Sequence, residues 1–243
     1  MELTGSYRHE LKYQISPADY YALRQRLRAV MKRDPHTGAD GLYTIRSVYF
    51  DNYGDKALRE KVNGVQKREK FRIRYYNDDI SFITLEKKIK HNDLCMKIDA
   101  PLTVEEYRRI LQAPGAWMLE HPQPLIRELY CKMKTQQLRP RVLVSYVREP
   151  YIYDAGNVRV TFDSHIRTSL PKRFFRWRDF GCLCNRYPQR YHFRGKIRCV
   201  SAGDHPLPAA IRRTPPAGVL KIRFLPPVRL ISHQLSISKE KAI

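Results

Sequence analysis

The sequence of 243 residues lacks several features that mark common classes of protein. It has no apolar run of about 18 residues, the length that a membrane-spanning helix needs. Its first residues lead directly into charged ones, so we expect no signal peptide. The five cysteines are odd in number and irregularly spaced, which argues against a disulfide framework. These absences predict a chain without a transmembrane segment that functions in a reducing cytoplasm.

Familiar signatures of catalysis and metal binding are also missing. There is no Gly-rich phosphate-binding loop, and no Ser-His-Asp or Cys-His arrangement is evident. Cys182, Cys184, His192 and Cys199 do not have the spacing of a common zinc finger. The function therefore has to be sought in the charged residues.

Positive charge is abundant. The chain holds 46 Lys and Arg against 24 Asp and Glu, which gives a formal net charge of +22. Such an excess is typical of proteins that bind polyanions, namely nucleic acid, an anionic membrane or phosphate-rich small molecules. Charge alone does not choose among these three.

Residues 1–169 alternate between strand-like and helix-like patterns. These patterns predict strands over residues 7–13, 43–51, 70–76, 81–90, 94–100, 141–148 and 158–166. Ser16-Pro17 and Thr103 are typical helix starts, so we expect a helix over residues 17–31 and another from residue 103. A further helix is predicted over residues 125–137, and a short helical turn over residues 56–61.

The pattern changes after Ser169. Residues 170–243 contain eight of the 16 prolines and three of the five cysteines, and neither helical nor strand periodicity persists. High charge combined with poor apolar clustering predicts weak order. We therefore divide the chain into a folded domain, residues 1–169, and a basic, proline-rich tail, residues 170–243.

Charges on the predicted strands follow the two-residue period by which alternate side chains share a face. Four strands have one charged face, formed by Arg8, Glu10 and Lys12, by Lys70, Arg72 and Arg74, by Thr84, Glu86, Lys88 and Lys90, and by Arg159, Thr161 and Asp163. One interpretation is that these faces meet water, as in many antiparallel sheets. The other is that amphipathic helices cover the opposite, apolar faces and that the charged faces line a closed channel.

A channel lined by cations needs an anion, because like charges repel one another in an enclosed space. Arginine suits phosphate because its planar guanidinium matches phosphate oxygens two at a time. Carboxylates on the same faces would hold a divalent cation that bridges phosphate oxygens. The second interpretation therefore predicts a phosphate-binding site.

Five segments carry a resemblance to a known family. They are Tyr7-Arg8-His9-Glu10-Leu11-Lys12-Tyr13, Ser47-Val48-Tyr49-Phe50-Asp51, Phe71-Arg72-Ile73-Arg74-Tyr75-Tyr76, Leu85-Glu86-Lys87-Lys88 and Val158-Arg159-Val160-Thr161-Phe162-Asp163. In this order they resemble the VTC domain, the polyphosphate polymerase domain of the triphosphate tunnel (CYTH-like) superfamily. The resemblance spans roughly residues 5–169. It implies an α+β fold in which an antiparallel β tunnel or barrel has a polar interior and flanking amphipathic helices.

The resemblance also implies roles for individual residues. The phosphate-binding residues would be Lys12, Arg72, Arg74, Lys88, Lys97, Arg148 and Arg159, with Arg72, Arg74 and Lys88 as the catalytic ones. Glu10 and Glu86 would be the ligands of Mn2+ or Mg2+. Alternatives stay open: Lys97 as a surface lysine, Arg148 as a charge at a sheet edge, and both glutamates as ion-pair partners of neighbouring cations.

The implied activity is transfer of the terminal phosphoryl group of a nucleotide onto a growing polyphosphate chain. ATP and polyphosphate would be the partners, with no specific nucleic acid. In such a reaction the protein mainly positions the phosphates and neutralises their charge. Three alternatives stay open: a module that binds nucleotide or polyphosphate without turnover, a triphosphate hydrolase, and a basic nucleic-acid-binding protein.

Two elements of the family are missing from this sequence: a strand with the pattern E-V-K-Y, which supplies the last metal-side Glu, and a later S-K-Y segment. The codons for His192 to Val200, read one nucleotide later, permit I-F-E-V-K-Y-D-A, and those for Val219 to Arg223 permit F-S-K-Y-A. We therefore hypothesise that residues from about Leu170 onward are translated out of frame. This hypothesis predicts a damaged copy whose tunnel lacks closing strands and leaves raw sheet edges.

Overall fold

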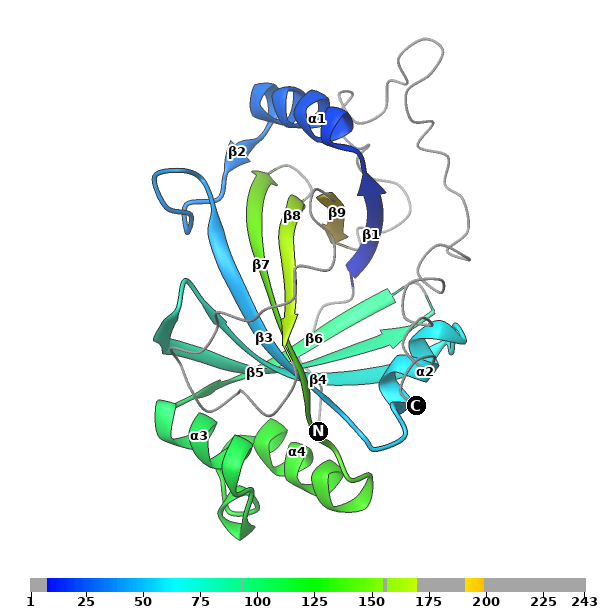
Figure 1. Ribbon diagram of the computed structural model, residues 1–243, viewed down its shortest axis with the longest axis vertical. Coiled ribbons are helices and arrows are strands. Elements are labelled where there is room, and N and C mark those ends of the chain that lie inside the picture. Colours follow the sequence, from blue (N-terminus) through cyan, green and yellow to red (C-terminus); the bar gives the residue numbers. More distant parts are fainter. Residues whose placement is uncertain (1–7, 93, 155–156, 170–190, 199–243) are drawn as a thin grey trace, which may run out of the picture.

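The computed structural model describes residues 8–92, 94–154, 157–169 and 191–198 (Figure 1). Its strands are β1 (Arg8–Ile15), β2 (Lys32–Arg33), β3 (Tyr43–Asp51), β4 (Lys67–Tyr76), β5 (Asp79–His91), β6 (Leu94–Leu102), β7 (Arg139–Tyr153), β8 (Val158–Ser169) and β9 (Tyr191–Arg198). Its helices are α1 (Pro17–Val30), α2 (Lys56–Val62), α3 (Val104–Gln112) and α4 (Pro124–Thr135), with a 3-10 turn, η1, at Ala116–Met118. None of these described helices is long and apolar enough to cross a membrane.

The described strands pair antiparallel in the order β2-β7-β3-β4-β5-β6-β1-β9-β8. A further pairing of β8 with β7 joins the last strand of this order back to the second, so the sheet closes into a ring. The short strand β2 pairs with the end of β7 and lies outside the ring. The predicted fold class, an α+β antiparallel tunnel with flanking helices, is confirmed.

Strand β9 closes the ring and corrects the expectation that no strand follows Ser169. It pairs with β1 along the whole of Arg8–Ile15 and with β8 from Arg159 to Asp163. In its sequence, Tyr191, Phe193 and Ile197 alternate with basic residues, which is a pattern typical of a strand. The segments on both sides of it are rich in proline and arginine. The expected absence of closing strands is therefore wrong for this segment. The rest of the predicted tail lies outside the described residues.

Strands β4 and β5 form a hairpin. Asn77 and Asp78 both have positive φ angles, 49° and 60°. Positive φ at two consecutive central residues matches the twist of a two-stranded hairpin, and Asn and Asp adopt it more readily than most residues. Next to this turn Tyr76 pairs with Asp79, and a register shift between Tyr76 and Arg74 then brings Arg72 opposite Glu86.

Helices cover the outside of the ring. Helices α3 and α4 lie over β4, β5 and β6, where they bury Phe71, Ile73 and Leu85 in the larger apolar core (Figure 1). Helix α1 covers β7 and β8, where Leu27 packs with Val160 and Phe162. The apolar faces of β4, β5 and β8 thus point outward into helices, and their charged faces point into the tunnel, as the second interpretation predicts.

Predicted helix starts are confirmed at two places. The Ser16 hydroxyl accepts a hydrogen bond from the backbone N–H of Asp19, whose carboxylate accepts one from the Ser16 backbone. Thr103 and Glu106 form the same reciprocal capping box at the start of α3. Such caps satisfy backbone N–H groups that a helix start leaves without partners, which fixes where α1 and α3 begin.

Candidate functional site

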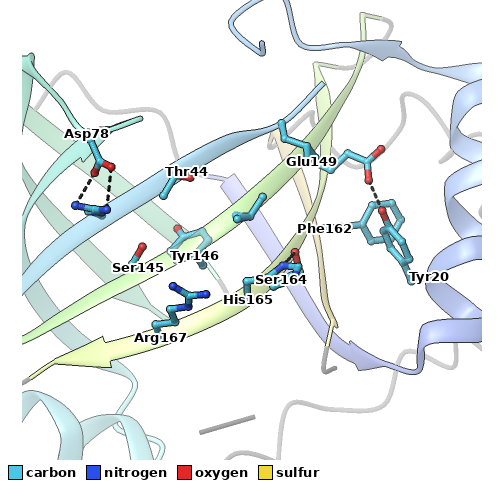
Figure 2. Close-up of a pocket in the computed structure, with 13 residues that line it drawn as sticks. Tyr20, Thr44, Asp78, Ser145, Tyr146, Glu149, Phe162, Ser164, His165 and Arg167 are labelled. Carbon is cyan, nitrogen blue, oxygen red and sulfur yellow. Dashed lines mark hydrogen bonds and ion pairs between the residues drawn. The ribbon is translucent and has the colours of Figure 1, made fainter. Parts of the chain in front are cut away.

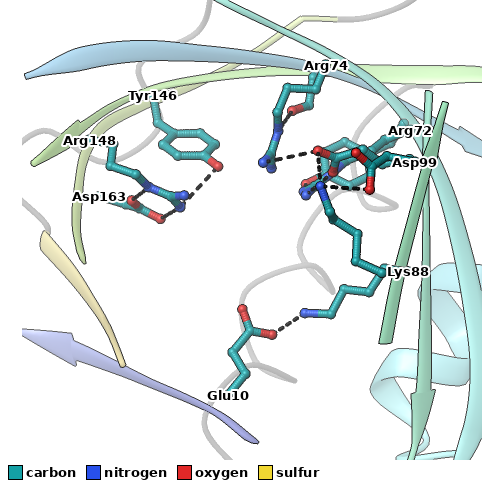
Figure 3. Close-up of polar contacts among 12 residues, drawn as sticks. Glu10, Arg72, Arg74, Lys88, Asp99, Tyr146, Arg148 and Asp163 are labelled. Carbon is teal, nitrogen blue, oxygen red and sulfur yellow. Dashed lines mark hydrogen bonds and ion pairs between the residues drawn. The ribbon is translucent and has the colours of Figure 1, made fainter. Parts of the chain in front are cut away.

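The centre of the tunnel is formed by neighbouring strands that present charged residues in register. On β4 and β5, Arg72 pairs with Glu86, and on β5 and β6, Lys88 pairs with Lys97. Paired residues of antiparallel strands project from the same face of a sheet. Figure 3 shows Arg72 and Lys88 inside the ring.

Glu86 is the focus of one cluster of cations. Its carboxylate accepts a hydrogen bond of 2.7 Å from Arg72 Nε, and Arg72 Nη2 lies 2.5 Å from the same oxygen. Arg74 Nη1 lies 3.5 Å and Lys97 Nζ 3.6 Å from the other oxygen. Only 2% of the Glu86 side chain is exposed. We call Glu86 with Arg72, Arg74 and Lys97 the Glu86 cluster.

The cations of the Glu86 cluster keep this carboxyl group ionised. Burial alone raises the pKa of Glu86, but Arg72, Arg74 and Lys97 outweigh burial and lower the pKa to about 2. The carboxylate is therefore the counterion of the cluster when no other anion is present.

A second cluster spans the interior of the tunnel. Lys88 of β5 contacts Glu10 of β1, although β6 lies between these strands in the sheet (Figure 3). Lys12 Nζ lies 3.7 Å from the same Glu10 oxygen, and only 6% of the Glu10 side chain is exposed. Lys12 and Lys88 therefore share one acidic group that is separate from Glu86.

The last two predicted cations each have their own carboxylate. Arg148 of β7 donates two hydrogen bonds, of 2.6 and 2.7 Å, to Asp163 of β8, and both side chains are buried. Arg159 contacts Asp34, whose side chain is almost fully buried. Arg148 is thus an interior residue, and the alternative that it is a charge at a sheet edge is excluded.

Three tyrosine hydroxyls hold arginines of the interior. Tyr49 accepts a hydrogen bond of 3.0 Å from Arg72, Tyr146 one of 3.3 Å from Arg148, and Tyr43 one of 2.9 Å from Arg159. Neither these tyrosines nor Asp34 is among the residues predicted from the sequence. Strand periodicity places Tyr43 and Tyr49 on one face of β3, but that pattern alone does not distinguish a tyrosine of a core from one that positions an arginine.

The family can now be decided. The sequence model of the VTC domain matches residues 7–204, which is most of the chain. The chain belongs to the VTC domain family. This match runs beyond Ser169 and includes β9, so the segment that closes the ring lies within the VTC domain match.

Solved structures with a similar arrangement share little sequence with this VTC domain. A putative adenylate cyclase from Bacillus halodurans is 13% identical, with 82% of this chain and 83% of that chain covered and a TM-score of 0.49. A putative adenylyl cyclase from Hippeastrum, described as having a dominant triphosphatase activity, is 10% identical, with 79% of each chain covered and a TM-score of 0.46. A search of curated proteins finds no matching sequence.

The described part of this VTC domain contains no group of three or more His, Cys, Asp or Glu side chains that could hold a metal ion. Glu10 and Glu86, the predicted metal ligands, belong to different clusters, and each is paired with cations. The described residues therefore form no ready metal site, and Mn2+ or Mg2+ stays a prediction. The roles of the predicted phosphate-binding residues stay predictions as well.

A pocket of about 460 Å³ lies on the opposite, outer side of β3, β7 and β8 (Figure 2). Thr44, Ser145 and Val147 line it from the strand faces that point away from the interior. At one end Arg46 Nη1 lies 2.5 Å from Asp78, and at the other Glu149 accepts a hydrogen bond of 2.7 Å from Tyr20. Arg46 and Arg167 line the pocket together with Asp78 and Glu149, so it does not share the cation excess of the tunnel.

Proposed function

We propose that this VTC domain binds a triphosphate or polyphosphate chain inside its tunnel and transfers the terminal phosphoryl group of a nucleoside triphosphate to polyphosphate. The supporting observation is the Glu86 cluster, in which three inward-facing cations from adjacent strands meet a single buried carboxylate. A phosphate group brings more negative charge than Glu86 and has more acceptor oxygens. It can therefore satisfy donors that one carboxylate leaves underused.

The chemistry that the tunnel would support is a displacement at phosphorus. A terminal oxygen of the polyphosphate chain forms a bond to the γ-phosphorus of the nucleotide, the bond from that phosphorus to the bridging oxygen breaks, and nucleoside diphosphate leaves. Arg72 and Arg74 would neutralise the oxygens of the transferred group, and Lys88 would hold a neighbouring phosphate in line. A bound Mn2+ or Mg2+ would add charge neutralisation at the phosphate oxygens.

Binding and turnover can be tested separately. Isothermal titration of the full chain with inorganic triphosphate and with ATP, each with and without Mn2+, measures binding. Arg72→Gln and Arg74→Gln should each lower the affinity for triphosphate by about tenfold to a hundredfold, because each removes charged hydrogen bonds to phosphate. Arg141→Gln is the matched control, since Arg141 pairs with Asp55 outside the Glu86 cluster. Equal effects of the three substitutions would contradict the proposed site.

Turnover is measured by incubating the chain with ATP and Mn2+ and following ADP release and polyphosphate length. Polyphosphate that lengthens as ADP appears supports the transferase. Tight binding without ADP would instead support the binding module, and release of free phosphate the hydrolase. Tight binding of a random DNA duplex that survives Arg72→Glu would favour the nucleic-acid alternative.

A further inference from the structure

The cations inside the ring continue beyond the Glu86 cluster toward the end of the tunnel where α2 lies. Arg68, Lys70, Arg72 and Arg74 occupy every second position of β4, and no register shift interrupts this row. Lys70 pairs with Lys88 and Arg68 pairs with Lys90 on β5, so β5 continues the row with cations and not with acids. At about 3.4 Å per residue, the row from Arg68 to Arg74 is about 20 Å long. A triphosphate is shorter than this row.

Helix α2 adds another cation at this end of the tunnel. The helix packs against β3 and β4 and lies beside the start of β4 (Figure 1). Asp51, the last residue of β3, fixes the start of α2, because its carboxylate accepts hydrogen bonds from the backbone N–H groups of Ala57 and Leu58 at 2.9 and 3.1 Å. Lys61, in the last turn of the anchored helix, is half-buried.

These cations differ from those of the Glu86 cluster because no carboxylate of the described residues forms an ion pair with them. In the ranges that the structure describes, neither Lys61 nor Lys70 forms an ion pair, and Arg68 donates to the carbonyl oxygen of Val65 at 2.6 Å. The carboxylate of Asp51, which acts electrostatically on Lys70, accepts hydrogen bonds from the backbone N–H of Asn52 and from two backbone N–H groups of α2. Half-buried positive charges without a counterion repel each other, and an added anion would relieve this repulsion.

We propose that Lys61, Arg68 and Lys70 form an additional phosphate-binding subsite at the α2 end of the tunnel, which makes a linear polyphosphate longer than triphosphate the preferred ligand. The proposal rests on the proposed function, since it extends the same tunnel. It adds chain-length selectivity and assigns it to three residues outside the Glu86 cluster.

Protonation of Lys70 provides a second measure of this subsite. Burial, together with the positive charges of Lys61 and Arg68, lowers the pKa of Lys70 to about 8, against the opposite effects of Tyr49 and Asp51 on β3. Burial also lowers the pKa of Lys61, and Arg68 adds to this effect. Lys88, opposite Lys70 on β5, is paired with Glu10. A phosphate at the subsite would favour protonated Lys70, so binding above pH 8 would take up a proton.

The test compares inorganic triphosphate with a longer linear polyphosphate of defined length, titrated into the full chain. The longer chain should bind about tenfold or more tightly per molecule than triphosphate. Lys61→Gln and Lys70→Gln should each lower the affinity for the longer chain by about tenfold. The affinity for triphosphate should stay unchanged. Lys67→Gln, an exposed lysine on the outward face of β4, is the matched control and should change neither ligand.

Proton uptake is measured above pH 8 by repeating the titration in buffers of different ionisation enthalpy. Uptake with the longer chain that disappears in Lys70→Gln supports the subsite. Equal affinities for both ligands, or Lys61→Gln and Lys70→Gln variants that match Lys67→Gln, would overturn it while the proposed function stands. If triphosphate itself does not bind and Arg72→Gln has no effect, the proposed function fails first.

Discussion

Glu86 and Lys87 are consecutive residues of β5 with opposite surroundings. Glu86 points into the tunnel, where three cations surround one acid. Lys87 points outward under α4, where its Nζ lies 3.1 Å from Glu69 and contacts Glu128. Lys132 of α4 lies 2.5 Å from Glu69, so the outer group pairs two lysines with two glutamates.

The two sides of β5 therefore serve different purposes. In the outer group the positive and negative charges are equal in number, and their ion pairs join α4 to the sheet. This group therefore requires no counterion from solution. The inner group has more positive than negative charge, although Asp99 contacts Lys97 at 3.3 Å from a half-exposed position. A surplus of buried charge costs stability unless a ligand neutralises it. We therefore expect the outer charges to stabilise the fold and the inner charges to be the ones that bind an anion.

Loss of the inner acid should have the largest effect. Glu86→Gln leaves Arg72, Arg74 and Lys97 without their counterion, and the free energy of unfolding should fall by about 3–5 kcal/mol. Inorganic triphosphate should stabilise this variant more than the wild-type chain, because it supplies the missing charge. Urea unfolding with and without triphosphate measures both values. An equal gain in both proteins would contradict the view that ligand and Glu86 compete for the same cations.

Lowering the pH should remove the stabilising effect of Glu86 without a mutation. The pKa of Glu86 is lowered from 4.5 to about 2, so its contribution is fully present above pH 4.5 and is lost as the pH falls through about 2. The contribution amounts to about 3 kcal/mol at 1.36 kcal/mol per pKa unit. Unfolding curves of wild-type and Glu86→Gln proteins should converge over this range. Curves that stay parallel would show that Glu86 does not carry the acid sensitivity.

Loss of the outer lysine should have the smallest effect. In Lys87→Gln, Glu69 keeps Lys132 and Glu128 is about one third exposed, so the free energy of unfolding should fall by about 1–2 kcal/mol. Triphosphate should bind this variant as it binds the wild-type chain. Thermal unfolding measures the stability of this variant, and isothermal titration measures its affinity for triphosphate. A loss of triphosphate affinity would contradict the view that only the inner face of β5 binds the ligand.

Much of this arrangement follows from local sequence patterns. The two-residue period identifies the charged faces of β4, β5 and β8, and Ser16 and Thr103 identify helix starts, because both depend on residues near one another in the chain. Which cation meets which acid depends on distant pairing. Lys88 and Glu10 are 78 residues apart, and their contact requires a closed ring that no local pattern shows. Tyr49 and Asp34 were missed for the same reason.

Strand β9 was not predicted, because the composition of the surrounding segment was given more weight than the alternating pattern of the strand itself. Prolines and arginines on both sides of it suggested weak order, although Tyr191, Phe193 and Ile197 alternate as in a strand. The reading frame of this segment stays a hypothesis. Sequencing the gene around the codon for Ser169, together with mass spectrometry of the natural protein, distinguishes a shifted frame from an intact one.

The position of β9 between β1 and β8 has a consequence for how the ring assembles. Without β9, β1 is joined to the sheet through β6 by two residue pairs, at Arg8 and His9. The first of the described strands, β1, is therefore held in the sheet mainly by the last of them, β9. During synthesis the ring stays open between β1 and β8 until residue 198 has left the ribosome. A fragment that stops at Ser169 would have the same gap between β1 and β8.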